Sequence, residues 1–232
     1  MGEMGRAFDG SYAEYALLPN EQIYPVDSQL PWSELAAVPE TYYTAFGSFK
    51  NLQIKEGDSI LVRAATSGVG LAFLKLVKAQ FPQNRVVGTV RSLAKKDLLQ
   101  YLGFDEIILD EKGVLQTEEK FDKILELVGP ATLKNSFDHI QSAGIICNTG
   151  QLGGKWYVEE FDPIVEIKNN SFLTSFYSGN VSQQLIDELF SYIDTYQINV
   201  SPQRIFSLEQ IPAAHSYIES QAGFGKVVVL ND

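Results

Sequence analysis

A glycine-containing turn between two apolar stretches is the part of the sequence best suited to chemistry. Residues 60–72 read Ile-Leu-Val-Arg-Ala-Ala-Thr-Ser-Gly-Val-Gly-Leu-Ala. This run predicts a buried strand, a tight turn and the start of an apolar helix, where backbone N–H groups and the helix dipole favour a phosphate. Gly68 and Gly70 leave room for a pyrophosphate and for close contact between helix and strand. The G-x-G-x-x-G spacing reads Ala65-x-Ser67-x-x-Gly70, so an ordinary β–α turn stays an alternative.

The elements that must position this turn are short apolar runs that alternate with helical patterns. We expect strands at 59–64, 85–90, 106–110, 123–128, 144–148 and 171–177. We expect helices at 69–80 and 94–102, and a further helix that contains Leu133, Phe137 and Ile140 at helical spacing. This alternation predicts an α/β fold of the Rossmann type, with a doubly wound parallel sheet over residues 39–180.

The two ends of the chain, residues 1–38 and 181–232, do not follow this alternation. Residues 10–30 suggest strand and loop, and the C-terminal part suggests a helix, a strand at 204–206, a short helix and a strand at 226–230. Neither end is long enough to bury a core of its own. We therefore expect them to form two pieces of one second lobe, the rest of which is missing.

Ligands of open α/β sheets bind beyond the carboxyl ends of the strands, where the strand order reverses. Small and polar residues occupy most of the positions that follow the predicted strands, as a ligand close to the backbone requires. They are Ser67, Gly68, Val69 and Gly70 after the first strand, Arg91 and Ser92 after the second, Gly129 after the fourth, Thr149 and Gly150 after the fifth, and Phe176 and Tyr177 at the end of the sixth.

The end of the second strand indicates which dinucleotide would bind. An NAD enzyme places Asp or Glu there to bind the ribose hydroxyls. This chain instead has Arg91 and Ser92, with Lys95 close behind. Because these groups form charge-assisted hydrogen bonds with a 2′-phosphate, they favour NADPH over NADH. A solvated Arg–Lys surface is the alternative, although positive charge at a helix start costs about 0.3–1 kcal/mol. The missing acid also counts against a methyltransferase.

Composition excludes several other functions. The 232 residues carry a net charge of −11, which argues against nucleic acid and anionic membranes as partners. The sequence has no apolar run of about 20 residues and lacks a signal-peptide pattern. A single cysteine predicts the cytoplasm and, with His139 and His215 on different predicted helices, argues against a metal site. We expect both histidines to be partly exposed and Cys147 to be inert core. No G-x-S-x-G elbow indicates a hydrolase.

Together these segments resemble the medium-chain dehydrogenase/reductase superfamily, and within it the zinc-free quinone oxidoreductase branch. Residues 9–15 are similar to the strand before its cofactor domain, and 35–45 to its entry helix. Residues 54–62 resemble the approach to its first Rossmann strand, and 225–229 its closing strand. The family begins with a longer GroES-like lobe, and this chain starts near the end of that lobe. The resemblance therefore predicts remnants of a GroES-like β lobe at 1–38 and 181–232.

The resemblance also implies site residues. The positions that match the family's cofactor contacts are Ser67, Gly68, Val69, Arg91, Ser92, Lys95, Val128, Gly129, Thr149 and Gly150. It implies that Thr44 lies near the nicotinamide, that Phe176 helps to wall the pocket, and that a homodimer forms through the strand near 171–177. Without a metal, a hydroxyl such as that of Tyr43 or Thr44, or solvent, donates the proton; an aromatic packing role suits Tyr43 better.

Three functions remain open from the sequence. The first is an NADPH-dependent reductase of a quinone, enal or related conjugated carbonyl, which works without zinc. The second is a catalytically silent NADPH-binding interaction or sensor module, which the shortened lobe suggests. The third is an unstable fragment, because an incomplete lobe exposes apolar surface.

Overall fold

The structure is a computed structural model that describes residues 4–220 and 223–231. The chain divides into two compact units. One unit combines Met1–Tyr43 with Ser178–Asp232, and the other is the continuous segment Thr44–Tyr177. The sequence placed the corresponding boundaries at 39 and 180.

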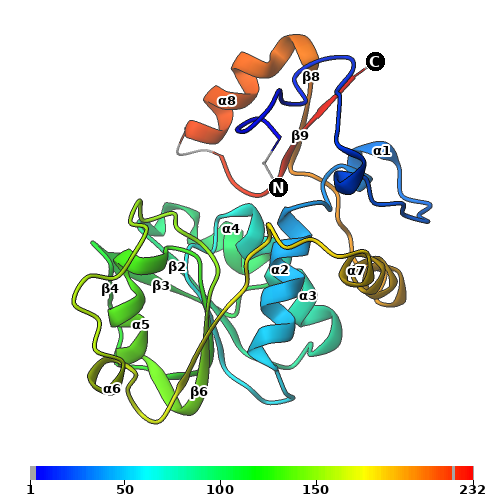
Figure 1. Ribbon diagram of the computed structural model, residues 1–232. Helices are drawn as coiled ribbons and strands as arrows, with labels where there is room; N and C mark the ends of the chain where they lie inside the picture. Colours follow the sequence, from blue (N-terminus) through cyan, green and yellow to red (C-terminus); the bar gives the residue numbers. More distant parts are fainter. Residues whose placement is uncertain (1–3, 221–222, 232) are drawn as a thin grey trace. The chain divides into compact units, whose positions relative to one another are not determined.

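The continuous unit is built on a seven-stranded sheet of order β4-β3-β2-β1-β5-β6-β7 (Figure 1). The strands are β1 (Ile60–Val62), β2 (Val86–Val90), β3 (Glu106–Glu111), β4 (Val114–Leu115), β5 (Phe121–Glu126), β6 (Ile140–Asn148) and β7 (Phe172–Ser175). All neighbouring strands are parallel except β3 and β4, which are antiparallel. The strand order reverses between β1 and β5, so the predicted doubly wound sheet is confirmed, with one antiparallel strand added at its edge.

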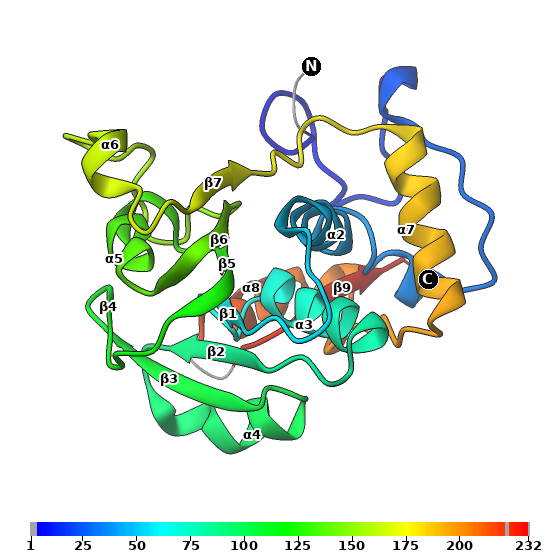
Figure 2. The same ribbon diagram turned by 90° about the horizontal axis from the view of Figure 1, so that it is seen from below.

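Helices cover both faces of this sheet. They are α2 (Thr41–Leu52), α3 (Gly68–Gln80), η2 (Leu93–Lys95), α4 (Lys96–Tyr101), η3 (Gly129–Ala131), α5 (Leu133–Asp138) and α6 (Pro163–Glu166). The part of α2 in this unit and α3 lie on one face, and α5 lies on the other (Figures 1 and 2). This arrangement leaves the carboxyl ends of β1 and β5 at the point where the two halves of the sheet diverge.

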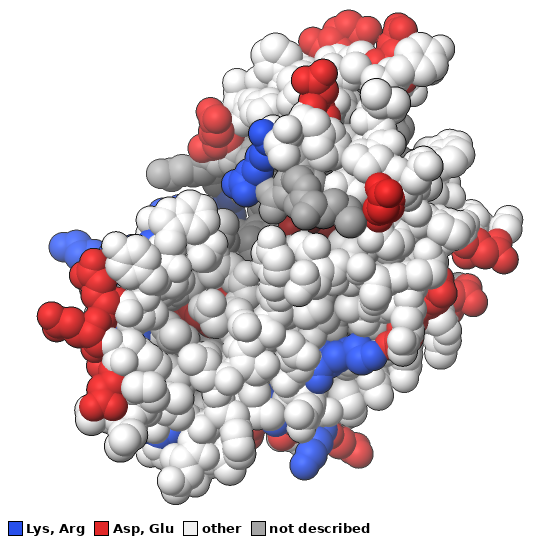
Figure 3. All heavy atoms as spheres, viewed as in Figure 1, with Lys and Arg blue, Asp and Glu red and all other residues white. Residues whose placement is uncertain are grey.

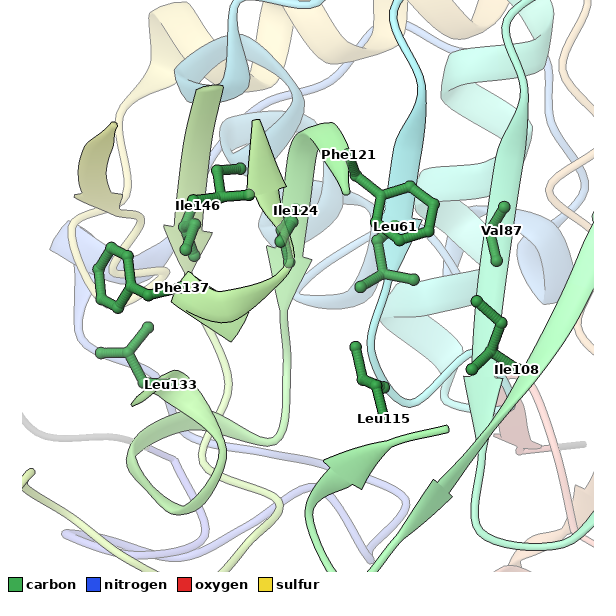
Figure 4. Close-up of a cluster of buried hydrophobic side chains, with 10 residues drawn as sticks. Leu61, Val87, Ile108, Leu115, Phe121, Ile124, Leu133, Phe137 and Ile146 are labelled. Carbon is green, nitrogen blue, oxygen red and sulfur yellow. The ribbon is translucent and has the colours of Figure 1, made fainter. Parts of the chain in front are cut away.

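The core on the α5 side explains the apolar strand sequences. Leu61, Ile124 and Ile146 from three neighbouring strands pack with Leu133 and Phe137 of α5 (Figure 4). Strands of a parallel sheet are buried on both faces, and for this reason they read as continuous Val, Ile and Leu runs. Burial of this kind contributes about 1.5–3 kcal/mol for each large side chain.

One helix prediction is wrong at its end. Helix α5 stops at Asp138, and Ile140 begins β6 opposite Phe121 of β5. Ile140 is fully buried, so it satisfies the spacing of a helix while the pairing with β5 fixes it as a strand residue. Tertiary pairing overrides local periodicity here.

The discontinuous unit contains η1 (Asn20–Gln22), α1 (Trp32–Leu35), α7 (Gln183–Thr195), β8 (Arg204–Ser207), η4 (Leu208–Gln210), α8 (Ile211–Glu219) and β9 (Val227–Leu230). Strands β8 and β9 pair in parallel, and the Phe206 and Tyr217 rings pack at 6.2 Å between centroids. Residues 10–30 contain no strand, so that part of the expectation is wrong. The predicted C-terminal helices and strands are present.

Acidic side chains recur around the margin of the face drawn in Figure 3, with broad uncharged areas between them. This distribution agrees with the net charge of −11. Among the described helices, none has the length and apolar content that crossing a membrane requires.

Candidate dinucleotide site

The turn after β1 is closed by Ser67, which caps α3. The Ser67 Oγ atom accepts a hydrogen bond from Gly70 N at 3.0 Å, and the first intrahelical bond runs from Leu71 N to Ser67 O at 3.0 Å. The N–H groups of Gly68 and Val69 therefore have no acceptor within the helix. They are the amides that α3 can offer to an anion at its positive end.

The backbone at this turn excludes a side chain at position 70. A Cβ on Gly70 would lie 2.9 Å from the Ala64 carbonyl oxygen, so only glycine fits without a shift. Ala64 itself adopts a positive φ of 64°. Gly70, the one glycine of the G-x-G-x-x-G spacing that this sequence has, is thus the one that the turn requires. Its amide N–H already donates to Ser67 Oγ, so it cannot also bind a phosphate.

Cationic side chains follow β2, the strand beside β1. Arg91 is exposed and has no ion pair among residues 44–177. Ser92 caps the short helix η2, with Ser92 Oγ accepting from Ala94 N at 3.4 Å. Lys95 is partly buried, and this burial lowers the pKa of its ammonium group. A nearby anion would offset the cost of holding that charge in a partly dehydrated position.

The turns after β5 and β6 lie against each other through glycines. Thr149 N donates to Glu126 O at 2.9 Å, and Gly153 N donates to Val128 O at 2.8 Å. Gly129 has a φ of +87°, and a Cβ on it would stand 2.3 Å from the Gly150 carbonyl oxygen. The predicted residues Val128, Gly129, Thr149 and Gly150 are therefore brought together in one double turn.

Helix α2 joins this double turn through a buried hydroxyl that the sequence analysis missed. Ser48 is fully buried; its Oγ donates to Thr44 O at 2.8 Å and lies 2.8 Å from Thr149 Oγ1. Since the Ser48 proton goes to Thr44 O, the Thr149 hydroxyl donates to Ser48. Thr149 Oγ1 is also 3.3 Å from Cys147 Sγ. A hydroxyl chain thus links Thr44 to the end of β6.

Cys147 is buried as predicted, and burial raises the pKa of its thiol.

Phe176 packs against α2 at Gly47, where a Cβ would stand 2.1 Å from a ring carbon. The absence of a side chain at Gly47 sets the position of the Phe176 ring. The pocket role of Phe176 stays a prediction.

Tyr43 belongs to the discontinuous unit, where its hydroxyl is engaged on both sides. The Tyr43 OH donates to Asn180 O at 3.1 Å and accepts from Ser182 N at 3.1 Å. Its side chain is 4% exposed. These contacts support a structural role, and catalysis by Tyr43 stays a prediction.

A charged network at the reversal point was also missed. Arg63 follows β1 and Glu126 ends β5, and both side chains are fully buried. The sequence carried a signal, because each interrupts an otherwise apolar run. Arg63 pairs with Asp110, which is 47 residues away in the sequence, and periodicity does not reveal such a partner.

Metal donors do not gather in the described residues: no group of three or more His, Cys, Asp or Glu there could hold a metal ion. His215 is exposed in α8 with its Nε2 2.9 Å from Tyr12 OH. The prediction that His139 is partly exposed is wrong: it is 7% exposed and its Nδ1 lies 2.9 Å from Glu119 O. His139 lies between the end of α5 and the first residue of β6, and it is buried there.

Known proteins resemble this chain over most of its length. The quinone oxidoreductase of Sus scrofa is 24% identical over 95% of this chain and 69% of its own length. A Dictyostelium discoideum protein named "Probable polyketide synthase 14" is 25% identical over 94% of this chain, which spans only 8% of that protein. The chain therefore corresponds to part of each relative.

Solved structures agree with the fold. Bacillus subtilis protein yhfP with NAD bound has a TM-score of 0.80 and 23% identity, covering 98% of this chain and 72% of that one. The yhdH oxidoreductase from Salmonella enterica in complex with NADP has a TM-score of 0.80 and 16% identity, covering 97% of this chain and 72% of that one.

The family model described as zinc-binding dehydrogenase matches residues 102–229, which is more than half of the chain. The donor set of the described residues does not fit the zinc in that description. The chain belongs to the zinc-binding dehydrogenase family, within the medium-chain dehydrogenase/reductase superfamily.

Proposed function

We propose that this chain is an NADPH-dependent oxidoreductase that reduces a quinone, an enal or a related conjugated carbonyl without zinc. The observation that carries the proposal is that the amides of α3 follow β1, while the cationic side chains follow the neighbouring strand β2. The amides of Gly68 and Val69 suit a pyrophosphate, and Arg91, Ser92 and Lys95 suit a 2′-phosphate. Relatives and structural neighbours named for quinone reduction or for bound NAD and NADP support it.

The chain's own carbonyl oxygens occupy the Cβ positions of Gly70, Gly129 and Gly150, so these glycines allow the turns around the proposed site to pack tightly. When bound, NADPH supplies the hydride that reduces the acceptor. The chain's own residues hold its phosphates, orient its ring and exclude water. Because Tyr43 OH donates to Asn180 O, we assign proton donation to Thr44 or to solvent.

The test is a fluorescence titration of NADPH and NADH with the native protein and with Arg91→Ala. Loss of charge-assisted hydrogen bonds raises the Kd for NADPH about tenfold or more, and leaves the Kd for NADH within about threefold. Lys96→Ala is the matched control, because Lys96 is an exposed cation in the same segment. Equal or tighter binding of NADH by the native protein would remove the argument from Arg91.

A second candidate is an NADPH-binding module without catalysis. The observation in its favour is that the hydroxyl of Tyr43, one of the expected proton donors, is engaged by Asn180 O and Ser182 N. Turnover of NADPH with a panel of quinones and enals separates the two candidates. Binding with no turnover supports the silent module, and clear turnover excludes it.

We also propose a homodimer that forms through β7, and a cytoplasmic location. Strand β7 is the last in the sheet, and its Phe172 is 58% exposed. An unpaired apolar edge of this kind favours pairing with a second copy. Phe172→Lys should convert a dimer to a monomer in analytical ultracentrifugation, whereas Lys112→Ala at the other end of the sheet should not.

A further inference from the structure

Arg63 and Glu126 form a buried charged centre at the point where the strand order reverses. Arg63 follows β1, Glu126 ends the neighbouring strand β5, and both side chains are 0% exposed. The Arg63 guanidinium pairs with Asp110 and donates to Thr132 O at 3.2 Å and Ser136 Oγ at 3.1 Å. Its Nε lies 3.8 Å from Glu126 Oε2.

A buried ion network is weak evidence for stability, because apolar side chains of similar volume often stabilise a core as well or better. The position of this network therefore calls for a local reason. Glu126 Oε1 accepts hydrogen bonds from Val128 N and from Gly129 N, each at 2.9 Å. Glu126 Oε2 accepts from Ser136 Oγ at 2.5 Å. The carboxylate thus turns two amides of the site inward.

The adjoining amides on this side are occupied as well. Gly150 N donates to Glu126 O at 3.2 Å, Leu152 N to Leu127 O at 3.2 Å and Gly153 N to Val128 O at 2.8 Å. The two sides of the reversal point therefore differ in kind. The β1 side offers amides that have no acceptor in their own helix, whereas the β5 side has its amides bonded internally above a carboxylate.

We propose that Glu126 is a positioning residue that sets the polarity of the dinucleotide site. By holding the Val128 and Gly129 amides inward, it closes the β5 side to phosphate and leaves that side to the uncharged nicotinamide end. The pyrophosphate is then received only on the β1 side. This inference rests on the proposed dinucleotide function.

The test compares Glu126→Leu with Glu126→Gln. Both variants remove the same buried charge and leave Arg63 with Asp110, but only glutamine keeps an acceptor for the Val128 and Gly129 amides. The triple variant Arg63→Met, Asp110→Asn and Glu126→Leu removes every charge of the network, keeps an acceptor for Gly113 N, and keeps the comparison open if Glu126→Leu does not fold. The readouts are the Kd values of NADPH and of its fragment 2′,5′-ADP, and amide hydrogen exchange at Val128 and Gly129.

Glu126→Leu removes the two hydrogen bonds that hold the Val128 and Gly129 amides inward. We therefore expect this variant to raise the Kd of NADPH about tenfold. The same variant leaves the Kd of 2′,5′-ADP within about twofold, since that fragment contacts only the β1 and β2 side, and it speeds exchange of both amides. Glu126→Gln keeps both Kd values near native. Equal loss of NADPH and 2′,5′-ADP binding, or unchanged exchange in Glu126→Leu, overturns the inference while native NADPH binding still supports the proposed function. Failure of the native protein to bind NADPH overturns both.

Discussion

The backbone of Gly129, in the turn after β5, packs directly against the backbone of Gly150, in the turn after β6. A Cβ on Gly129 would lie 2.3 Å from the Gly150 carbonyl oxygen, and a Cβ on Gly150 would lie 2.1 Å from the Leu127 carbonyl oxygen. Neither obstacle is a side chain that can rotate away. The two turns can approach to this degree only because both residues are glycines.

Gly129→Ala is expected to destabilise the protein more than its backbone conformation alone explains. Gly57 provides the matched control, because it has the same φ of +87° with nothing within 4 Å of its Cβ position. Gly57→Ala should cost about 1–2 kcal/mol for the left-handed conformation. Gly129→Ala should cost at least about 2 kcal/mol more, measured by urea unfolding, because the backbone must move. Equal losses in the two variants would refute the contact.

The effect of Gly47→Ala on the free energy of unfolding is expected to change sign when Phe176 is replaced. Alanine in the middle of a helix is favoured over glycine by about 1 kcal/mol. In the native background the new Cβ would meet the Phe176 ring at 2.1 Å, so the variant should lose about 1–2 kcal/mol. In a Phe176→Ala background the same change should stabilise the protein. Additive effects in this cycle, followed by thermal unfolding, would show that the ring does not contact Gly47.

Tyr43→Phe distinguishes a structural hydroxyl from a catalytic one. The variant leaves Ser182 N and Asn180 O without their partner, which should cost about 1–3 kcal/mol of the free energy of unfolding. Tyr101→Phe, at a tyrosine that is 87% exposed, should change it by less than about 0.5 kcal/mol. With NADPH and a quinone, kcat of Tyr43→Phe should stay within about twofold of native. A loss of a hundredfold or more would assign proton donation to Tyr43.

The raised pKa of Tyr42 predicts that the protein loses stability at alkaline pH. Burial, with a smaller effect of the Glu34 charge, raises the pKa of Tyr42 above its ordinary value of 10.0. The folded state favours the neutral phenol, so this contribution is fully present below pH 10.0 and is lost as pH rises beyond it. Tyr42→Phe should make the fall in the free energy of unfolding between about pH 9 and about pH 11 shallower. An unchanged slope would contradict the assignment.

The sequence was sufficient for the parallel strands of the sheet because such strands are buried on both faces. Runs such as Ile60–Val62 and Val86–Val90 are mostly apolar and buried throughout, and their order predicted where the carboxyl ends lie. The residues that follow those ends could therefore be named before the structure. Their roles in binding a ligand stay predictions.

What the sequence could not provide depends on contacts between distant residues. Strand β4 has only two residues, too few for any pattern, and Ile140 fits a helix until its pairing with Phe121 is known. The inward amides at Val128 and Gly129 depend on the carboxylate of Glu126, two and three residues earlier, which is buried beside Arg63 from the turn after β1. Periodicity carries no information about such pairings.

The unlike ends of the sheet limit how large an assembly can grow. At one end β4 contributes a two-residue antiparallel strand, which is too short to recruit a further chain. At the other end β7 is longer and exposes Phe172. If two copies join β7 to β7 about a twofold axis, each uses the longer edge strand of its seven-stranded sheet, and the combined sheet has the short β4 strand at both ends. Growth of this sheet from copy to copy then stops at the pair.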